Sequence, residues 1–339
     1  MRLITLEEHY RSKQVDAEIG EAGNYFRSTN SAGEQMAGQR LANLTDLGER
    51  RLADMDKSGI DMQVLSHTHP SPEILDAARA VSLCRRVNDE VAEAAARYPG
   101  RFAGFATLPV ADPSAAAREL ERTVTELGFK GALINGAPHG RFLDDPSFAP
   151  LLERAEALDV PLYLHPAPPP EIVQKAYFSG LEPALARMLS IAGWGWHAEL
   201  GLHTLRLIAA GVFDRFPKLQ VIIGHMGEMI PFFLARVSAV LTPFTKNSNG
   251  SVADYFHRNI HITTSGVFTA PPLYLSLEVV GADRIMFSVD YPYSPNEAGR
   301  AFLEKLSLST ADFEKITHAN AERLLKIEAA PADSKSGPD

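Results

Sequence analysis

The chain has 339 residues, 45% of them hydrophobic and 22% charged, and its net charge at pH 7 is −9. This composition is typical of a soluble globular protein with a large core, and an acidic chain without a run of Lys and Arg lacks the charge that nucleic acid or an anionic membrane attracts. No apolar run reaches the roughly 18 residues of a membrane span, and the single cysteine, Cys84, has no internal disulfide partner. We therefore expect a cytoplasmic protein with small-molecule partners.

Eight short apolar runs rich in β-branched residues alternate with longer segments of helical periodicity. Two helical segments, residues 74–97 and 114–127, are amphipathic, and Asp112-Pro113 before the second is a typical helix start. Eightfold strand-helix alternation favours parallel strands closed into an α/β fold of the (β/α)8 TIM-barrel type over an open doubly wound sheet or two domains. The expected strands are residues 3–6, 62–65, 102–108, 130–134, 160–164, 219–223, 259–263 and 284–289.

Two connections are too long for ordinary barrel loops. Residues 10–45 follow the first strand and contain Tyr25 and Phe26, and residues 166–197 follow the fifth strand. Because both insertions follow strands, we expect them on the C-terminal face of the barrel, as walls of an active site. The barrel should fill residues 1–327, and residues 328–339 should form a polar tail, to which we assign no function.

The first strand ends in two carboxylates and an imidazole. Successive side chains of a strand alternate between its faces, so Glu7 and His9 should point the same way while Glu8 points the other way. Such a pair can hold a metal ion, but on its own it is more often a short edge strand that runs into a polar turn. The ends of the other strands have to decide between these interpretations.

Polar residues also follow three other strands. Strand five is followed by His165, strand six by His225 and Glu228, and strand eight by Asp290. Because the C-terminal ends of barrel strands meet at one rim, these groups and the pair on the first strand should converge. Two imidazoles and two carboxylates suit Zn²⁺ or Mn²⁺ and differ from the all-oxygen site that Ca²⁺ prefers.

These motifs resemble those of the amidohydrolase-related metal-dependent decarboxylases. The resemblance covers residues 1–327 and is to the γ-resorcylate (2,6-dihydroxybenzoate) type, in the branch that also holds aminocarboxymuconate semialdehyde decarboxylase. It rests on Leu6-Glu7-Glu8-His9, Leu164-His165-Pro166, Gly224-His225-Met226-Gly227-Glu228 with Arg236, and Phe287-Ser288-Val289-Asp290-Tyr291-Pro292.

The resemblance implies a role for each of these residues. The ligands of one divalent ion, Zn²⁺ or Mn²⁺, would be Glu7, His9, His165 and Asp290. His225 would be a catalytic group beside the ion, Arg236 would face the substrate carboxylate, and no organic cofactor would be needed. Glu228, three residues after His225, could orient its ring and stabilise its cationic form. The assembly would be a homodimer or homotetramer.

Some positions depart from the resorcylate pattern. Val237-Ser238-Ala239 follows Arg236 where those enzymes tend to carry an aspartate and often an asparagine, and Ser294-Pro295 stands where many relatives have a glutamate. His67 and His69, after the second strand, could line the pocket or lie on an exposed loop. These departures leave the identity of the substrate open.

The leading hypothesis is non-oxidative, reversible decarboxylation of a hydroxylated aromatic acid such as a dihydroxybenzoate. Asp290 or His225 would protonate the carboxyl-bearing carbon, and Tyr25 or Phe26 would cover the site and stack on the ring. The alternative is hydrolysis of a lactone, amide or ester by a metal-bound water, with Asp290 or His225 as the base. The intact ligand set argues against a third possibility, a binding protein on an inactive barrel.

Overall fold

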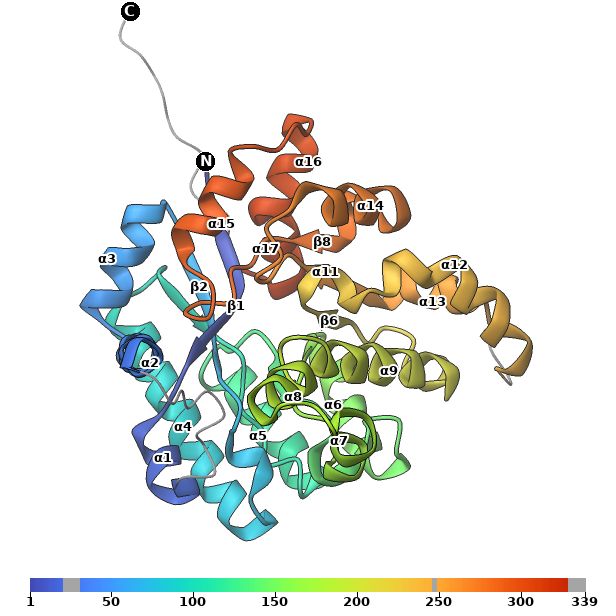
Figure 1. Ribbon diagram of the computed structural model, residues 1–339, viewed down its shortest axis with the longest axis horizontal. Coiled ribbons are helices and arrows are strands. Elements are labelled where there is room, and N and C mark those ends of the chain that lie inside the picture. The colour runs from blue at the N-terminus through green and yellow to red at the C-terminus, as the bar shows by residue number, and fades with distance from the viewer. Residues whose placement is uncertain (21–30, 246–248, 329–339) are drawn as a thin grey trace, which may run out of the picture.

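Parallel strands surrounded by helices form this protein, whose computed structural model describes residues 1–20, 31–245 and 249–328 (Figure 1). The strands pair in chain order, β1 to β3 and β4 to β8, and every pairing is parallel. They are β1 (Ile4–Tyr10), β2 (Met62–His67), β3 (Phe102–Gly104), β4 (Ala132–Asn135), β5 (Leu162–His165), β6 (Val221–Ile223), β7 (Ile260–Thr263) and β8 (Ile285–Met286).

Two joints close these strands into a barrel. At the first, a parallel bridge between Ala106 and Ala132 connects the chain after β3 to β4. At the second, β1 meets the segment after β8, where the His9 backbone N–H donates to the Tyr291 carbonyl at 2.7 Å and the Glu7 N–H donates to Ser288 Oγ at 2.6 Å. The predicted (β/α)8 barrel is therefore confirmed.

Two strands are four residues shorter than the sequence predicts. Residues 102–108 and 284–289 are expected to be strands, whereas β3 and β8 end at Gly104 and Met286. After β8 the backbone bonds to side chains: the Ser288 N–H donates to Thr264 Oγ1 and the Val289 N–H to Glu8 Oε1, both at 2.9 Å. Side-chain partners thus replace the regular strand ladder at the rim of the barrel.

Helices cover the outside of the barrel between the strands. The helix predicted over residues 74–97 begins at Ala77 because Asp76 caps it, and Asp112 caps the helix predicted over residues 114–127. Of the helices within the described ranges, none is both long and apolar enough to cross a bilayer. Those that follow β1 to β5 are α1 (Lys13–Ile19), α2 (Ser31–Leu44), α3 (Glu49–Ser58), α4 (Ala77–Arg97), α5 (Pro113–Thr125), α6 (Ala149–Leu158), α7 (Glu171–Phe178), α8 (Pro183–Ser190), α9 (Gly195–Ala209) and α10 (Val212–Arg215). Those that follow β6 to β8 are α11 (His225–Glu228), α12 (Ile230–Leu241), α13 (Val252–Asn259), α14 (Ala270–Val280), α15 (Asn296–Leu303), α16 (Thr310–Glu314) and α17 (Asn320–Leu325).

The two long connections carry helices of their own. The first holds α1 to α3 between β1 and β2, and the second holds α7 to α10 between β5 and β6. Both leave the C-terminal ends of strands, which is the rim where the candidate ligands lie. Tyr25, Phe26 and the tail from residue 329 lie outside the described residues.

Side chains fill the barrel, so its chemistry is confined to its ends. Ile4, Leu6, Tyr163 and Ile222 belong to one buried cluster inside the strands, and Leu325 of α17 joins that cluster near the N-terminal end. A larger buried cluster packs the strands against the surrounding helices. A filled interior is what a TIM-type barrel requires.

Acid should destabilise this fold through its buried histidines. His203 of α9 is 1% exposed, its Nε2 accepts from the Leu143 N–H at 2.9 Å, and burial lowers its pKa to about 4. The unfolded chain binds a proton at this residue near pH 6.5, but the folded ring binds one only near pH 4. Stability present above pH 6.5 is therefore lost as the pH falls toward 4, by about 1.4 kcal/mol per pH unit.

The His203→Gln variant should lose less stability in acid than the wild type. Glutamine keeps an acceptor for the Leu143 N–H and removes the titration. Between pH 6.5 and 5, we expect its free energy of unfolding to fall by roughly 2 kcal/mol less than that of the wild type. Urea denaturation at the two pH values measures both changes, and equal losses in the two proteins would contradict the assignment.

Candidate metal centre

Four predicted ligands meet at the C-terminal end of the barrel. One ligand atom from each of Glu7, His9, His165 and Asp290 lies within 4.8 Å of all the others. His9 Nε2 is 3.2 Å from Asp290 Oδ1, and His165 Nε2 is 3.4 Å from Glu7 Oε1. The ends of β1 and β5 and the loop after β8 therefore bring together residues that are far apart in the sequence.

A β-bulge in β1 turns Glu7 toward this cluster. Between the paired positions Thr5 and Glu8, β1 has one residue more than the matching stretch of β2. Leu6 faces the apolar interior, and strict alternation would put its neighbour Glu7 on the opposite face. The extra residue allows Leu6 to fill the barrel while Glu7 still reaches the site, a use of bulges that is common beside active sites.

The two oxygens of the Glu7 carboxylate have different surroundings. The hydroxyls of Tyr163 and Ser265 donate to Oε2, whereas Oε1 is buried without a hydrogen-bond partner among the described residues. Gly224 leaves space for this arrangement, because a Cβ there would lie 2.5 Å from Glu7 Oε2. Because the two hydroxyls hold Oε2, the other oxygen, Oε1, points toward the remaining candidate ligands.

The unpaired atoms at the centre fit a bound cation. His9 Nε2 is also buried without a hydrogen-bond partner in the described part of the chain, while its Nδ1 lies 3.3 Å from Ser66 Oγ. Buried polar atoms are nearly always hydrogen-bonded. Two unpaired atoms among four potential metal-binding side chains are therefore best explained by a bound cation. The mixed nitrogen and oxygen set suits Zn²⁺ or Mn²⁺.

Burial shifts the pKa values of two of the candidate ligands. It raises the pKa of Glu7 and lowers the pKa of His165 well below its ordinary value. A metal ligand must be an anionic carboxylate or a neutral imidazole. The shift of His165 already provides the neutral ring, and a bound cation would offset the cost of the buried Glu7 charge.

His225 and Glu228 lie directly beside the cluster. His225 Nε2 is 3.7 Å from Glu7 Oε1, and its Nδ1 is 2.7 Å from Glu228 Oε1. Burial by itself would lower the pKa of His225, but the carboxylates of Glu228, Glu7 and Asp290 outweigh it and raise that pKa to about 10. These carboxylates therefore favour the protonated form of the ring.

Sequence reasoning missed three side chains at this rim. Tyr163 precedes His165 by two residues on β5, so strand alternation could have indicated it. The Tyr293 ring lies 5.6 Å from the His9 ring, and its hydroxyl is 2.6 Å from Thr68 Oγ1. His197 comes from α9 and bonds Glu228, and nothing in its local sequence marks it.

A fully buried arginine supports the end of β1. Arg51 of α3 donates from Nη2 to the His9 carbonyl at 2.5 Å and from Nε to the Asp46 carbonyl at 3.0 Å. Its guanidinium also lies 4.8 Å from the centre of the Tyr291 ring. Arg51 thus ties the backbone of a candidate ligand to the segment that follows β8.

The other residues named from the sequence lie in different environments. Arg236 is exposed on α12. His67 is buried and His69 is half-buried, and burial lowers their pKa values to about 3 and about 4, so the exposed-loop interpretation of this pair is wrong. The sequence does not show how exposed to solvent the residues just after a strand are, and here the loop folds back onto the barrel.

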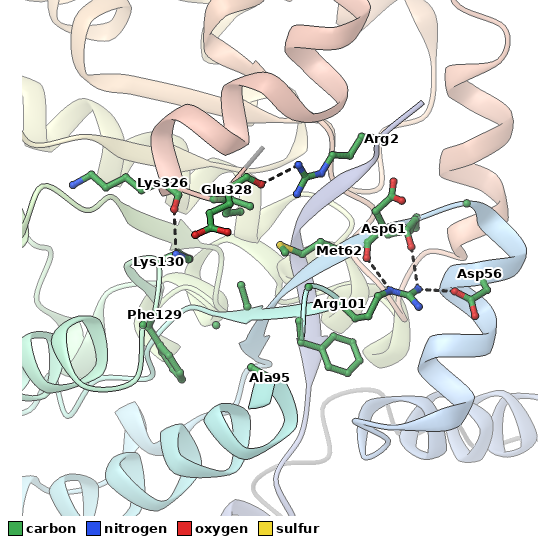
Figure 2. Close-up of a pocket in the computed structure, with 18 of the residues that line it drawn as sticks. Arg2, Asp56, Asp61, Met62, Ala95, Arg101, Phe129, Lys130, Lys326 and Glu328 are labelled. Carbon is green, nitrogen blue, oxygen red and sulfur yellow. Dashed lines mark hydrogen bonds and ion pairs between the residues drawn. The ribbon is translucent and has the colours of Figure 1, made fainter. Parts of the chain in front are cut away.

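A large cavity lies at the end of the barrel opposite to the metal-binding cluster. It has a volume of about 1210 Å³ and is lined by residues from the N-terminal ends of β1 to β4 (Figure 2). Its basic side chains have partners within the protein: Arg101 pairs with Asp56 at 2.6 Å, and Lys130 donates to the Lys326 carbonyl at 3.3 Å. Barrel enzymes keep their chemistry at the other end, so we assign no reaction to this cavity.

Comparison with known proteins agrees with this site and fold. Residues 43–327 match the sequence profile of the amidohydrolase family. The decarboxylase orsB of Emericella nidulans is 40% identical over 333 residues, which cover 96% of this chain and 97% of that protein. A γ-resorcylate decarboxylase of Polaromonas sp. is 36% identical over 335 residues, which cover 96% and 98%.

A solved structure extends the comparison to three dimensions. It is the dihydroxybenzoic acid decarboxylase of Polaromonas sp. with bound manganese and the inhibitor 2-nitroresorcinol. The TM-score is 0.87 at 36% identity, over 97% of this chain and 98% of that one. The chain therefore belongs to the amidohydrolase family and, within it, to the group of metal-dependent decarboxylases of the γ-resorcylate type.

Proposed function

We propose that this protein catalyses the non-oxidative, reversible decarboxylation of a hydroxylated aromatic acid such as a dihydroxybenzoate, with one divalent ion and no organic cofactor. The observation that carries the proposal is the cluster of four potential metal ligands with His225 beside it. Relatives that match nearly their whole length to this chain are decarboxylases, so the alternative of lactone, amide or ester hydrolysis has no support of its own.

Glu7, His9, His165 and Asp290 would hold the ion. When bound there, the ion would polarise the carboxylate and the adjacent phenol oxygen of the substrate and keep the ring in one pose. Both Zn²⁺ and Mn²⁺ suit the donors, and we favour Mn²⁺ because the Polaromonas enzyme holds manganese. Elemental analysis of the purified protein identifies the ion.

His225 would supply the proton that replaces the carboxyl group. Its Nε2 faces the cluster, and Glu228 fixes the ring from the other side. Transfer of the Nε2 proton to the carboxyl-bearing carbon interrupts the aromatic system. The carbon-carbon bond then breaks, its electron pair restores the ring, and carbon dioxide leaves.

The proton that His225 transfers is replaced from solvent. His225 is left neutral and regains a proton from water, so each turnover consumes one proton and releases one carbon dioxide. Asp290 is the other possible donor, but its Oδ1 faces His9 Nε2 within the ligand cluster. A ligand carboxylate is anionic, so His225 is the better acid.

Three further residues keep the roles predicted from the sequence, of which that of Arg236 is implied by the family resemblance. Arg236 would bind the substrate carboxylate, for which the fork of a guanidinium is well shaped. Tyr25 or Phe26 would stack on the ring as part of a cover. The cytoplasmic location stays a prediction from the sequence.

The activity is tested with a panel of hydroxybenzoates. Metal-loaded protein is incubated with isomers that differ in the positions of their hydroxyl groups, and carbon dioxide release is followed. We expect turnover only of acids with a hydroxyl next to the carboxylate, because both groups would have to bind the ion together. Release from none of the isomers would contradict the proposal.

A homodimer or homotetramer is expected in solution. Helix α12 extends outward from the barrel (Figure 1). Phe232 and Phe233 on this helix are 69% and 51% exposed. Phe244, just beyond the helix, is 80% exposed. The ring centres of Phe232 and Phe233 lie 5.0 Å apart, and adjoining exposed aromatic side chains usually mark an interface, which we call the α12 face. Light scattering should give the mass of two or four chains for the wild type.

Charge on this face should weaken the assembly. The Phe232→Glu/Phe244→Glu variant should have a lower mass at the same concentration, whereas Ile172→Glu, which changes an exposed residue of α7, serves as the matched control. A wild-type monomer, or equal masses for the wild type and both variants, would contradict the assignment of this face.

A further inference from the structure

We propose that His197 is a positioning residue, which holds Glu228 and, through it, His225 in the orientation that proton transfer needs. This role rests on the proposed function, but it is carried by contacts that are independent of any substrate. His197 lies in the first turn of α9, within the long connection between β5 and β6, and it is far in sequence from the residues that it serves.

The Glu228 carboxylate bridges two imidazoles. Its Oε1 is 2.7 Å from His225 Nδ1, and its Oε2 is 2.7 Å from His197 Nδ1. The Glu228 side chain is 0% exposed, and within the described residues these two rings are the hydrogen-bond partners of its carboxylate. With one ring removed, the carboxylate would be free to rotate away from the other.

His197 is itself fixed at both nitrogens. Its Nε2 is 3.1 Å from the Ala192 carbonyl, and its Nδ1 faces Glu228. Both partners are oxygen atoms that only accept, so the ring satisfies both when each of its nitrogens carries a hydrogen. The ring therefore offers Glu228 a fixed hydrogen-bond donor, and its centre lies 4.7 Å from that of His225.

The backbone that carries His225 and Glu228 needs such support. These residues and the intervening Met226 and Gly227 have φ angles of 48°, 52°, 56° and 81°, respectively. Positive φ at residues other than glycine is strained and persists where surrounding contacts enforce it. The bond from His197 ties this irregular turn to the regular helix α9.

The test compares two substitutions at His197 in the full-length, manganese-loaded protein. His197→Phe keeps a ring and removes both donors. His197→Asn places an amide N–H at the position of Nδ1, so it keeps the bond to Glu228 and loses the contact with Ala192. If the Phe variant does not fold, His197→Leu takes its place, since it also lacks donors. Thermal unfolding and metal content are measured for every variant.

We expect His197→Phe to lower kcat by about 10- to 100-fold, the range for loss of an orienting outer partner, with little change in KM and one ion per chain. His197→Asn should recover most of that loss. Unchanged kcat in the Phe variant would overturn the proposal, as would equally low kcat in both variants. So would two ions per wild-type chain that fall to one in the Phe variant, because His197, His225 and Glu228 would then hold a metal themselves.

A second readout separates this proposal from the proposed function. If the wild type releases no carbon dioxide from any hydroxybenzoate, the function fails, and a crystal structure of His197→Phe still tests the positioning role. We expect its Glu228 carboxylate to turn away from His225 Nδ1. A carboxylate that stays 2.7 Å from that nitrogen, as in the wild type, would overturn the role.

Discussion

Replacement of His165 by alanine is expected to remove both the metal ion and the activity. His165 is buried at the end of β5, with its Nε2 3.4 Å from Glu7 Oε1, and burial keeps its ring neutral and ready to bind a cation. Alanine leaves three donors and a void at the centre. The affinity for the metal ion should fall by more than roughly 10- to 100-fold, which is the loss when a residue that only supports a metal ligand is removed.

Elemental analysis after dialysis measures this loss. Glu7→Ala should behave as His165→Ala does, since it removes the unpaired Oε1. His203→Gln is the matched control, because it changes an equally buried histidine outside the cluster and should keep its metal and its turnover. Undiminished metal content in either ligand variant would show that the ion binds elsewhere.

Replacement of His225 by alanine is expected to abolish most of the activity and none of the metal binding. The four ligand atoms are complete without it, but the proton donor beside them is lost. General acid-base catalysis typically contributes about 10²- to 10⁴-fold, so kcat should fall by about that factor. Single-turnover kinetics on protein of measured metal content separates this effect from loss of the ion.

Two outcomes would change the assignment of His225. If His225→Ala loses its ion, His225 is a ligand and the set of four is wrong. If it keeps both the ion and full turnover, the ring has a structural role, and Asp290 must carry the proton alone.

The barrel and the convergence of the four candidate ligands were predictable because both follow from the pattern of the strands and their ends. Parallel strands present their C-terminal ends at one rim, so polar residues there had to converge. Period-two alternation correctly paired Glu7 with His9. The bulge that lets Leu6 and Glu7 both face inward depends on the register with β2, which the sequence of β1 does not contain.

The supporting contacts were not predictable because they come from distant segments. His197 reaches Glu228 from a helix within a long connection, and Arg51 reaches the His9 carbonyl from α3. Their own neighbours in sequence give no sign of either contact. The low exposure of His67 and His69 likewise depends on how a loop packs, and residue type alone suggested the exposed alternative.

The most direct test of the account is release of labelled carbon dioxide from carboxyl-¹³C 2,6-dihydroxybenzoate. Three samples are compared: wild type loaded with Mn²⁺, the same protein after chelation and dialysis, and His165→Ala. The account predicts one labelled carbon dioxide for each resorcinol formed by the loaded wild type, and no release above background from the other two. Release that continues at the same rate without metal, or none from the loaded wild type with this or any other hydroxybenzoate, would contradict it.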